Sequence, residues 1–261
     1  MAISSIPARD KRAAAHVRLW THNIYADRAG WEDRRRVLID GVREIQPDLI
    51  SLQETMVIPD YDQVADILGD GFHIVHSRAR ETGGQGISIA SRWPITAVHE
   101  LDLSVVSART GDFACTSLIA EIESPAPFGP MLLANHFPDY QVNHELERER
   151  QAVIAARALE NMVAARPMHV LLAGDLDAEP DAASLRFLTG KQSLDGLSVC
   201  YRNAWDSAHP GEPGHTFTPE NPLAPPDWPF RRIDHILVRC GRQGSPTRSW
   251  SSTDLSRSWS W

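Results

Sequence analysis

Apolar residues come in short runs along most of this 261-residue chain, and polar residues or turn formers separate the runs. In residues 17–24 (VRLWTHNI) apolar and polar side chains alternate, which predicts a strand because neighbouring side chains on an extended chain point to opposite faces. Similar short runs bounded by Gly, Pro or charged residues predict further strands. These strands span residues 48–52, 87–90, 113–122, 131–134, 168–173 and 232–238.

Helical spacing of apolar residues appears between several of these strands. It predicts a helix over residues 31–45, and Pro47 would prevent that helix from continuing. Residues 143–165 are rich in Glu, Arg and Ala, which is typical of a long amphipathic helix with a charged face in water. Shorter helices are predicted over residues 61–68 and 182–188. The alternation of strands and helices indicates an α/β fold.

The segment with the clearest chemical content is 168–181, MHVLLAGDLDAEPD. Asp175 and Asp177 follow the predicted strand at its carboxyl end, where open α/β sheets usually bind their ligands. On an extended backbone the two carboxylates would share a face. Paired acids at the mouth of a sheet suit a hard cation or an activated water. The structural alternative is a plain surface turn, since Asp and Gly are common turn formers.

Other polar residues also lie at or beside predicted strand ends. They are Asn23, Glu54, His136 and Asp234. Each has a structural alternative, because a charged residue often only ends an element and a single histidine is more often structural than catalytic. Taken with the acidic turn, the oxygen atoms of this set suit Mg²⁺ or Mn²⁺, with positions left for water and a substrate phosphate.

Composition narrows the class of protein. The chain has 26 Lys and Arg against 34 Asp and Glu, a formal charge of -8, which argues against tight sequence-independent binding of duplex DNA. A nuclease stays possible, because a metal ion can bring the phosphate in. Cys115, Cys200 and Cys240 are odd in number and widely spaced, so they indicate neither a disulfide framework nor a zinc site. A reducing, cytoplasmic location follows as the default.

The chain is expected to form one main domain over residues 17–240. Residues 1–16 have no apolar core of a signal peptide and are predicted to be a disordered extension, and no apolar run approaches the roughly 20 residues that span a membrane. Residues 203–229 are rich in Pro and Gly. Structureless segments of that length are usually functional or disordered.

Six motifs in order resemble the endonuclease/exonuclease/phosphatase superfamily, which has the DNase I-like fold. They are the Asn of THNI, LQET with Glu54, GISIASRWPI, NHF with His136, the GDLDAEP turn and RIDHILV. They extend over residues 17–238, nearly the whole chain. The resemblance implies a four-layer α/β/β/α sandwich of two mixed β-sheets with helices outside. It also implies a metal-dependent attack of water on a phosphate ester.

The resemblance further implies a role for each residue of the set. Asn23 and Glu54 would hold the divalent ion, and Asp175 would orient or polarise the attacking water. His136 would hydrogen-bond a phosphate oxygen, and Asp234 would fix the tautomer and angle of a catalytic histidine. Glu81 is a weaker candidate as a partner of His136.

Two departures from the family pattern stand out. Asp177 occupies a position where the family most often has Asn, and its charge would repel phosphate unless a metal ion or a raised pKa neutralises it. The family's terminal Ser-Asp-His is missing, and residues 241–261 are predicted to be an aberrant tail without the final strand. Loss of that histidine would reduce the rate about 10²- to 10⁴-fold. His209, His215 and His235 are candidate substitutes, although no spacing favours any of them.

The leading hypothesis is therefore a divalent-metal-dependent phosphodiesterase or phosphatase, impaired if the terminal histidine has no substitute. The acidic charge favours a small or lipid-like phosphate ester over nucleic acid. One alternative is a Mg²⁺-dependent endonuclease or exonuclease acting on DNA or RNA. A second alternative is a phosphate-binding pseudoenzyme without catalysis.

Overall fold

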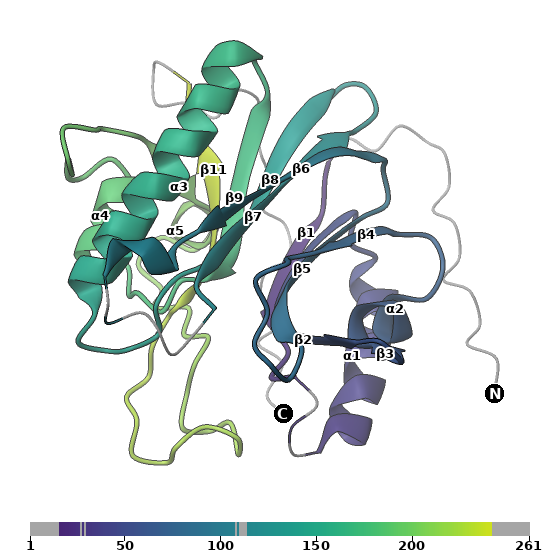
Figure 1. The fold of residues 1–261 in the computed structure, drawn as a ribbon. Coiled ribbons are helices and arrows are strands. Elements are labelled where there is room, and N and C mark those ends of the chain that lie inside the picture. Colours follow the sequence, from purple (N-terminus) through teal and green to yellow (C-terminus); the bar gives the residue numbers. More distant parts are fainter. Residues whose placement is uncertain (1–15, 27, 29, 108, 110–113, 242–261) are drawn as a thin grey trace.

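The computed structural model describes residues 16–26, 28, 30–107, 109 and 114–241. Two β-sheets pack face to face, and helices cover their outer faces (Figure 1). Each sheet contains both parallel and antiparallel pairs. The predicted α/β class and the four-layer α/β/β/α arrangement of two mixed sheets are thus confirmed.

The first sheet has the strand order β1-β2-β5-β4, and β3 pairs with the far end of β2. Its strands are β1 (Leu19–Asn23), β2 (Leu49–Ile58), β3 (Tyr61–Asp62), β4 (His73–His76) and β5 (Gln85–Ser91). Only β1 and β2 run parallel; the other pairs are antiparallel. Within the described residues β1 is an edge strand.

The second sheet has the order β10-β11-β9-β8-β7-β6. Its strands are β6 (Ile95–Asp102), β7 (Thr116–Glu123), β8 (Pro130–Phe137), β9 (His169–Asp175), β10 (Tyr201–Asn203) and β11 (Asp234–Arg239). The parallel pair β8 and β9 is central, and the remaining pairs are antiparallel. The acidic turn therefore leaves from the middle of the sheet.

Three apolar clusters separate the four layers. Helices α1 (Trp31–Ile45) and α2 (Gln63–Leu68) cover the first sheet, and α3 (Glu145–Ala165) and α4 (Ala183–Leu188) cover the second. The middle cluster, which includes Ile89 and Leu133, lies between the two sheets. No described helix is long and apolar enough to cross a membrane.

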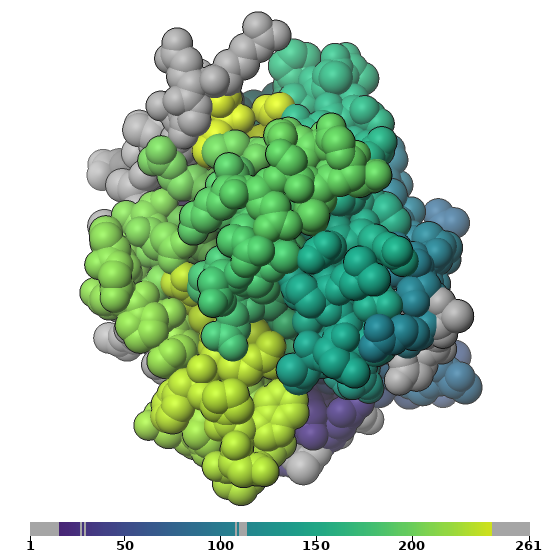
Figure 2. All heavy atoms as spheres, turned by 90° about the vertical axis from the view of Figure 1, so that its left-hand side faces the viewer, coloured from purple at the N-terminus to yellow at the C-terminus, as the bar shows by residue number. Residues whose placement is uncertain are grey.

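The structure adds elements that the sequence pattern did not predict. Strands β3, β4, β6 and β10 were not predicted, and β3 takes the first two residues of the helix predicted over residues 61–68. The Pro-rich segment begins with a short helix, α5 (Ala204–Ala208). A single turn of 3-10 helix, η1 (Ser104–Val106), precedes β7. Figure 2 shows the later part of the Pro-rich segment, coloured yellow-green, as a lobe at the lower end of the molecule. The predictions for residues 1–15 and for the tail from 242 to 261 concern residues outside the described part.

Candidate active site

The amide of Asn23 joins the two sheets at one end of the sandwich. Asn23 is the last residue of β1, and its Nδ2 donates to Glu54 Oε1 at 2.9 Å and to Asp175 Oδ2 at 3.0 Å. Glu54 belongs to the first sheet, whereas Asp175 is the last residue of β9 in the second. Asn23 Oδ1 accepts a hydrogen bond from the backbone N–H of Tyr25 at 3.0 Å. Three residues from distant parts of the chain therefore meet at one rim.

Glu54 is placed by a bulge and not by the end of a strand. The sequence pattern ended the strand at Leu52, but β2 continues to Ile58. The register with β5 shifts between Leu52 and Thr55, and Glu54 has φ +52°. Such a backbone is uncommon for residues other than Gly, and bulges often redirect a side chain beside an active site. The bulge turns the carboxylate of Glu54 toward Asn23.

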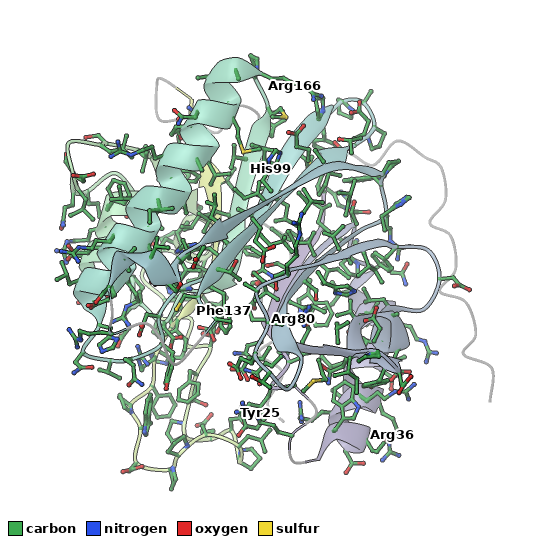
Figure 3. The ribbon with its side chains drawn as sticks, viewed as in Figure 1. Tyr25, Arg36, Arg80, His99, Phe137 and Arg166 are labelled. Atoms are coloured by element: carbon green, nitrogen blue, oxygen red, sulfur yellow. The ribbon has the colours of Figure 1, made fainter. Side chains whose placement is uncertain are left out.

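Arg80 holds the backbone on both sides of this bulge. Its Nη1 donates to Thr55 O and to Gly84 O, each at 2.8 Å, and its Nη2 donates to Ile87 O at 3.1 Å. Arg80 has no carboxylate among its hydrogen-bond partners in the described residues, and burial lowers its pKa. In Figure 3 Arg80 lies toward the lower end of the first sheet, the end near Tyr25. We therefore regard Arg80 as a positioning residue for Glu54.

Neutral polar side chains fill the space between the sheets behind the rim. We call Gln53, Thr55, Ser88 and Asn135 the polar seam. Asn135 Nδ2 donates to Leu52 O at 2.8 Å and to Ser88 O at 3.0 Å, and Gln53 Nε2 donates to Asn135 Oδ1 at 2.8 Å. The hydroxyls of Thr55 and Ser88 are 2.7 Å apart. Because the bonds of Asn135 cross from one sheet to the other, they fix the sheets relative to each other and thereby set the approach of Glu54 to Asp175.

Two further acids adjoin Asp175. Asp234, the first residue of β11, is its direct partner across the antiparallel pairing. The backbone N–H of Asp177 donates to Asp175 Oδ1 at 3.3 Å, and Asp177 has φ +47°. The two acids of the turn are close as expected, but a left-handed turn and not strand alternation brings Asp177 there. We call Glu54, Asp175, Asp177 and Asp234 the acidic rim.

Burial dominates the electrostatics of the acidic rim. It raises the pKa of Asp175 well above its usual range, and the charges of Asp177 and Asp234 raise it further. Burial raises the pKa of Asp177 to about 7, with Arg231 and Arg148 acting in the opposite direction. Burial likewise raises the pKa of Asp234 to about 6. Without a bound cation Asp175, Asp177 and Asp234 therefore retain protons more readily than exposed carboxyls do.

Arg231 links the Pro-rich segment to the acidic turn. Its Nη2 donates to the backbone carbonyl of Asp177 at 3.2 Å, and its guanidinium lies 5.9 Å from the ring of Trp228. Trp228 in turn contacts Phe217 edge to face, and Phe217 pairs with Arg231 through backbone hydrogen bonds. An aromatic surface is thereby anchored beside the rim.

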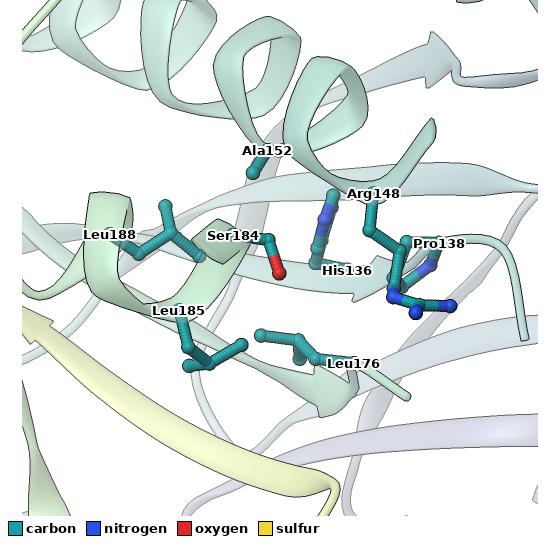
Figure 4. Close-up of a pocket in the computed structure, with 8 residues that line it drawn as sticks. All are labelled: His136, Pro138, Arg148, Ala152, Leu176, Ser184, Leu185 and Leu188. Carbon is teal, nitrogen blue, oxygen red and sulfur yellow. The ribbon is translucent and has the colours of Figure 1, made fainter. Parts of the chain in front are cut away.

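His136 does not contact the acidic rim in the described residues. Asn135 takes the position facing the first sheet, so strand alternation directs His136 to the opposite face, under α3 and α4. Figure 4 shows its ring between Ala152 and Arg148, under α3, among the residues that line a small pocket. Its Nδ1 lies 3.0 Å from Ser117 Oγ, so Ser117 and not Glu81 is its partner. Burial lowers the pKa of His136 to about 4, which keeps the ring neutral.

None of the candidate substitutes for the terminal histidine reaches the acidic rim through a hydrogen bond among the described residues. His235 is buried between Asn203, whose amide lies 3.0 Å from Nδ1, and Ala178 O, which accepts from Nε2 at 2.9 Å. His209 stacks on Trp205, and His215 lies against Phe230. Asp234 has Thr216 as its hydrogen-bonding neighbour, and no described histidine bonds to it.

The donor atoms at the rim fit a hard divalent cation. Glu54 Oε2 is buried and has no hydrogen-bond partner among the described residues, although Oε1 of the same carboxylate is bonded to Asn23. An unpaired buried carboxylate oxygen is costly unless a cation or donor meets it. Among the described residues no group of three or more His, Cys, Asp or Glu is arranged to hold a metal ion. A site with few protein ligands, whose other positions are taken by water and substrate, is usual for Mg²⁺.

The sequence motifs could not indicate Arg80, the polar seam or Arg231. Arg80 lies in a turn with ordinary composition, and its contacts arise only when β2 and β5 pair. Asn135 precedes the histidine of the NHF motif, and that proximity to a strand end was its only signal. Long-range hydrogen bonds of this kind leave no periodic pattern in a sequence.

Comparison with known proteins gives one family and several similar folds. A model described as the Endonuclease/Exonuclease/phosphatase family matches residues 20–251. The human Nocturnin catalytic domain with bound sulfate is similar, with 18% sequence identity, a TM-score of 0.67, and coverage of 85% of this chain and 82% of that one. D. rerio TDP2 complexed with a single-strand DNA product has 18% identity and a TM-score of 0.67, covering 88% and 86%.

An endonuclease/exonuclease/phosphatase from Bacteroides vulgatus is also similar, with 17% identity and a TM-score of 0.66, covering 85% of this chain and 87% of that one. The comparison with curated proteins found no match. At these identities the solved structures show a shared fold.

Proposed function

We propose that this chain, which belongs to the endonuclease/exonuclease/phosphatase family, hydrolyses phosphate esters with the help of Mg²⁺ or Mn²⁺. One observation carries this proposal. The amide of Asn23 bridges Glu54 and Asp175 from the two sheets, and a buried oxygen of Glu54 has no partner in the described part of the chain. A site that only stabilised the fold would not gather buried acids without cations to pair them.

Glu54 and Asn23 are the residues that would hold the ion. Glu54 offers its unpaired Oε2, and Asn23 Oδ1 keeps one lone pair beyond its bond to Tyr25 N–H. When bound, a divalent cation supplies a Lewis acid that activates water and offsets charge on the phosphate. The geometry also gives Asn23 a second task, because its Nδ2 fixes the angle between Glu54 and Asp175.

The remaining rim residues would act on water and on the phosphate. Asp175 lies at the end of β9 with one oxygen bonded to Asn23, so its other oxygen can accept a hydrogen bond from the attacking water and orient it. Arg231 would offset the negative charge that Asp177 presents to the phosphate. His136 would act as a phosphate donor only if its ring left Ser117 and turned toward the rim. Asp234 would orient a histidine only if one moved toward it, because its hydrogen-bonding neighbour among the described residues is Thr216.

Charge and the aromatic surface favour a small or lipid-like ester as the substrate. The formal charge of -8 disfavours a polyanion such as duplex DNA. Trp228 and Phe230 are 37% and 45% exposed beside Arg231, so a ring or an apolar group of the substrate could pack on them. A nuclease is the second candidate, because a similar fold, that of D. rerio TDP2, was solved with a DNA product. The free cysteines support a cytoplasmic location.

The test is hydrolysis of bis-p-nitrophenyl phosphate and p-nitrophenyl phosphate with Mg²⁺, Mn²⁺ or EDTA. We expect turnover that EDTA abolishes and that Glu54→Gln lowers by about 10³-fold or more, because the ion loses its charged ligand. The exposed Glu32→Gln is the matched control and should leave turnover unchanged. Turnover that persists in EDTA or in Glu54→Gln would refute the assignment.

The same purified proteins also distinguish the two alternative functions, a nuclease and a phosphate-binding pseudoenzyme. Faster cleavage of plasmid or single-stranded DNA than of the small esters would favour a nuclease. Binding of phosphate without turnover of any ester would favour the pseudoenzyme.

A further inference from the structure

Cys200 and Cys240 face each other across the edge of the second sheet. In the antiparallel pairing of β10 with β11, Tyr201 is opposite Arg239, so the next pair outward is Cys200 and Cys240. The backbone N–H of Cys240 donates to Cys200 O at 2.9 Å. Directly opposed residues joined in this way have Cα atoms about 5.5 Å apart, which lies within the range that a disulfide can bridge.

The two thiols differ in exposure. Cys200 is exposed to solvent, whereas Cys240 is 7% exposed, and both are free thiols. Their side chains are close enough to hydrogen-bond to each other, and Arg202 lies beside Cys240. Burial raises the pKa of the Cys240 thiol, and the positive charge of Arg202 acts in the opposite direction. An accessible attacking thiol thus stands next to a shielded one that can resolve its product.

We propose that Cys200 and Cys240 are a redox modification site that forms a reversible intramolecular disulfide with a low-molecular-weight disulfide such as oxidised glutathione. The Cys200 thiolate attacks one sulfur of that disulfide, its S–S bond breaks, and one glutathione thiolate leaves. Cys240 then loses its proton to water and attacks the Cys200 sulfur, which releases the second glutathione thiolate. Two protein thiols are oxidised, and one glutathione disulfide is reduced to two thiols.

The disulfide would link the two ends of the segment that contributes residues to the acidic rim. Between the two cysteines the chain contains Asn203, Arg231, Asp234 and His235. The disulfide restricts the unfolded chain and holds β10 to the end of β11, so oxidation should stabilise the folded state. A rise in Tm on the order of 5–10 °C is expected for a domain of this size.

Purified full-length protein is equilibrated in glutathione buffers of graded potential, alkylated and mapped by mass spectrometry. We expect a peptide cross-linked through Cys200 and Cys240 that dithiothreitol releases, together with the rise in Tm. Cys115→Ser, which removes the third and distant cysteine, is the matched control and should behave as the wild type. Cys200→Ser and Cys240→Ser should show neither change.

Three outcomes would overturn the inference. They are glutathione on Cys200 with Cys240 still free, disulfide-linked dimers in place of the internal bond, and a cross-link that leaves the Tm unchanged. Because none of these readouts measures ester hydrolysis, a failure here would not bear on the proposed catalytic function.

Discussion

The polar seam and the acidic rim are buried neighbours, yet they differ in how their polar groups are paired. In the seam, amides and hydroxyls both donate and accept, so Asn135, Ser88 and Thr55 bond to one another and to the backbone. In the rim, carboxylates only accept when ionised, and Asn23 is the side chain that bridges two of them. Among the described residues, Glu54 Oε2 in the rim and the amide oxygen Gln53 Oε1 in the seam both lack a hydrogen-bond partner, but only the oxygen of Glu54 belongs to an acid.

This difference indicates that the polar seam is structural and that the acidic rim is the candidate reactive site. Neutral polar groups that satisfy one another make a rigid connection between the sheets at little net cost. Several acids that cannot satisfy one another must take up protons or a cation. The contrast predicts that substitutions in the seam mainly lower the stability of the protein. Substitutions in the rim should lower its activity and raise its stability.

The largest effect is expected from Asn135→Leu in the seam. Leucine has a similar volume but leaves Leu52 O and Ser88 O without the amide that donates to them. It also removes one acceptor of the Gln53 amide, which keeps Ser51 Oγ at 3.0 Å. We expect a loss of about 3–4 kcal/mol in the free energy of unfolding, measured by urea denaturation. The exposed Asn143→Leu is the control and should change stability by less than about 0.5 kcal/mol. Equal effects of both substitutions would show that the seam does not join the sheets as described.

Arg80→Met tests whether the bulge positions Glu54. Loss of the donors to Thr55 O, Gly84 O and Ile87 O should cost about 2–3 kcal/mol of stability and weaken Mn²⁺ binding about tenfold or more. Calorimetric titration with Mn²⁺ gives the second quantity, and the exposed Arg78→Met serves as control. A stability loss with unchanged Mn²⁺ affinity would make Arg80 structural only.

His235 should make stability fall in acid. Burial lowers its pKa to about 4, so the unfolded chain, with a pKa near 6.5, binds the proton more readily. Its contribution is therefore constant above pH 7 and is lost as the pH falls from about 6.5 toward 4. Between pH 7 and 4.5 the wild type should lose about 2 kcal/mol more than His235→Gln, by urea denaturation in EDTA. Parallel pH profiles for the two proteins would contradict this view of His235.

The smallest effect is expected from Asp177→Asn in the rim. A carboxyl with a raised pKa destabilises the fold once the pH exceeds its unfolded value, and the full penalty is present above about pH 7. Asn is nearly isosteric and tolerates positive φ, so it should stabilise the metal-free protein by about 1 kcal/mol at pH 8 and by less at pH 5. If the variant is less stable at pH 8, Asp177 is ionised and well paired in the native protein.

Local patterns of apolar and polar residues predicted much of this fold. The helix α1 has the predicted bounds, and β1, β7, β8, β9, β11 and α3 lie within a few residues of theirs. Asn23, Glu54 and Asp175 meet as expected, because their strands end or bulge at the same rim. Periodicity finds these elements since it reports which face of each is buried.

Tertiary structure alone decided the rest. The pairing of β2 with β5 made the bulge that turns Glu54, and alternation along β8 sent Asn135 inward and His136 under α3. Cys200 and Cys240, forty residues apart in sequence, became neighbours only when β10 met β11. Register, bulges and long-range hydrogen bonds depend on which strands meet, and a linear pattern of apolar and polar residues contains no record of that choice.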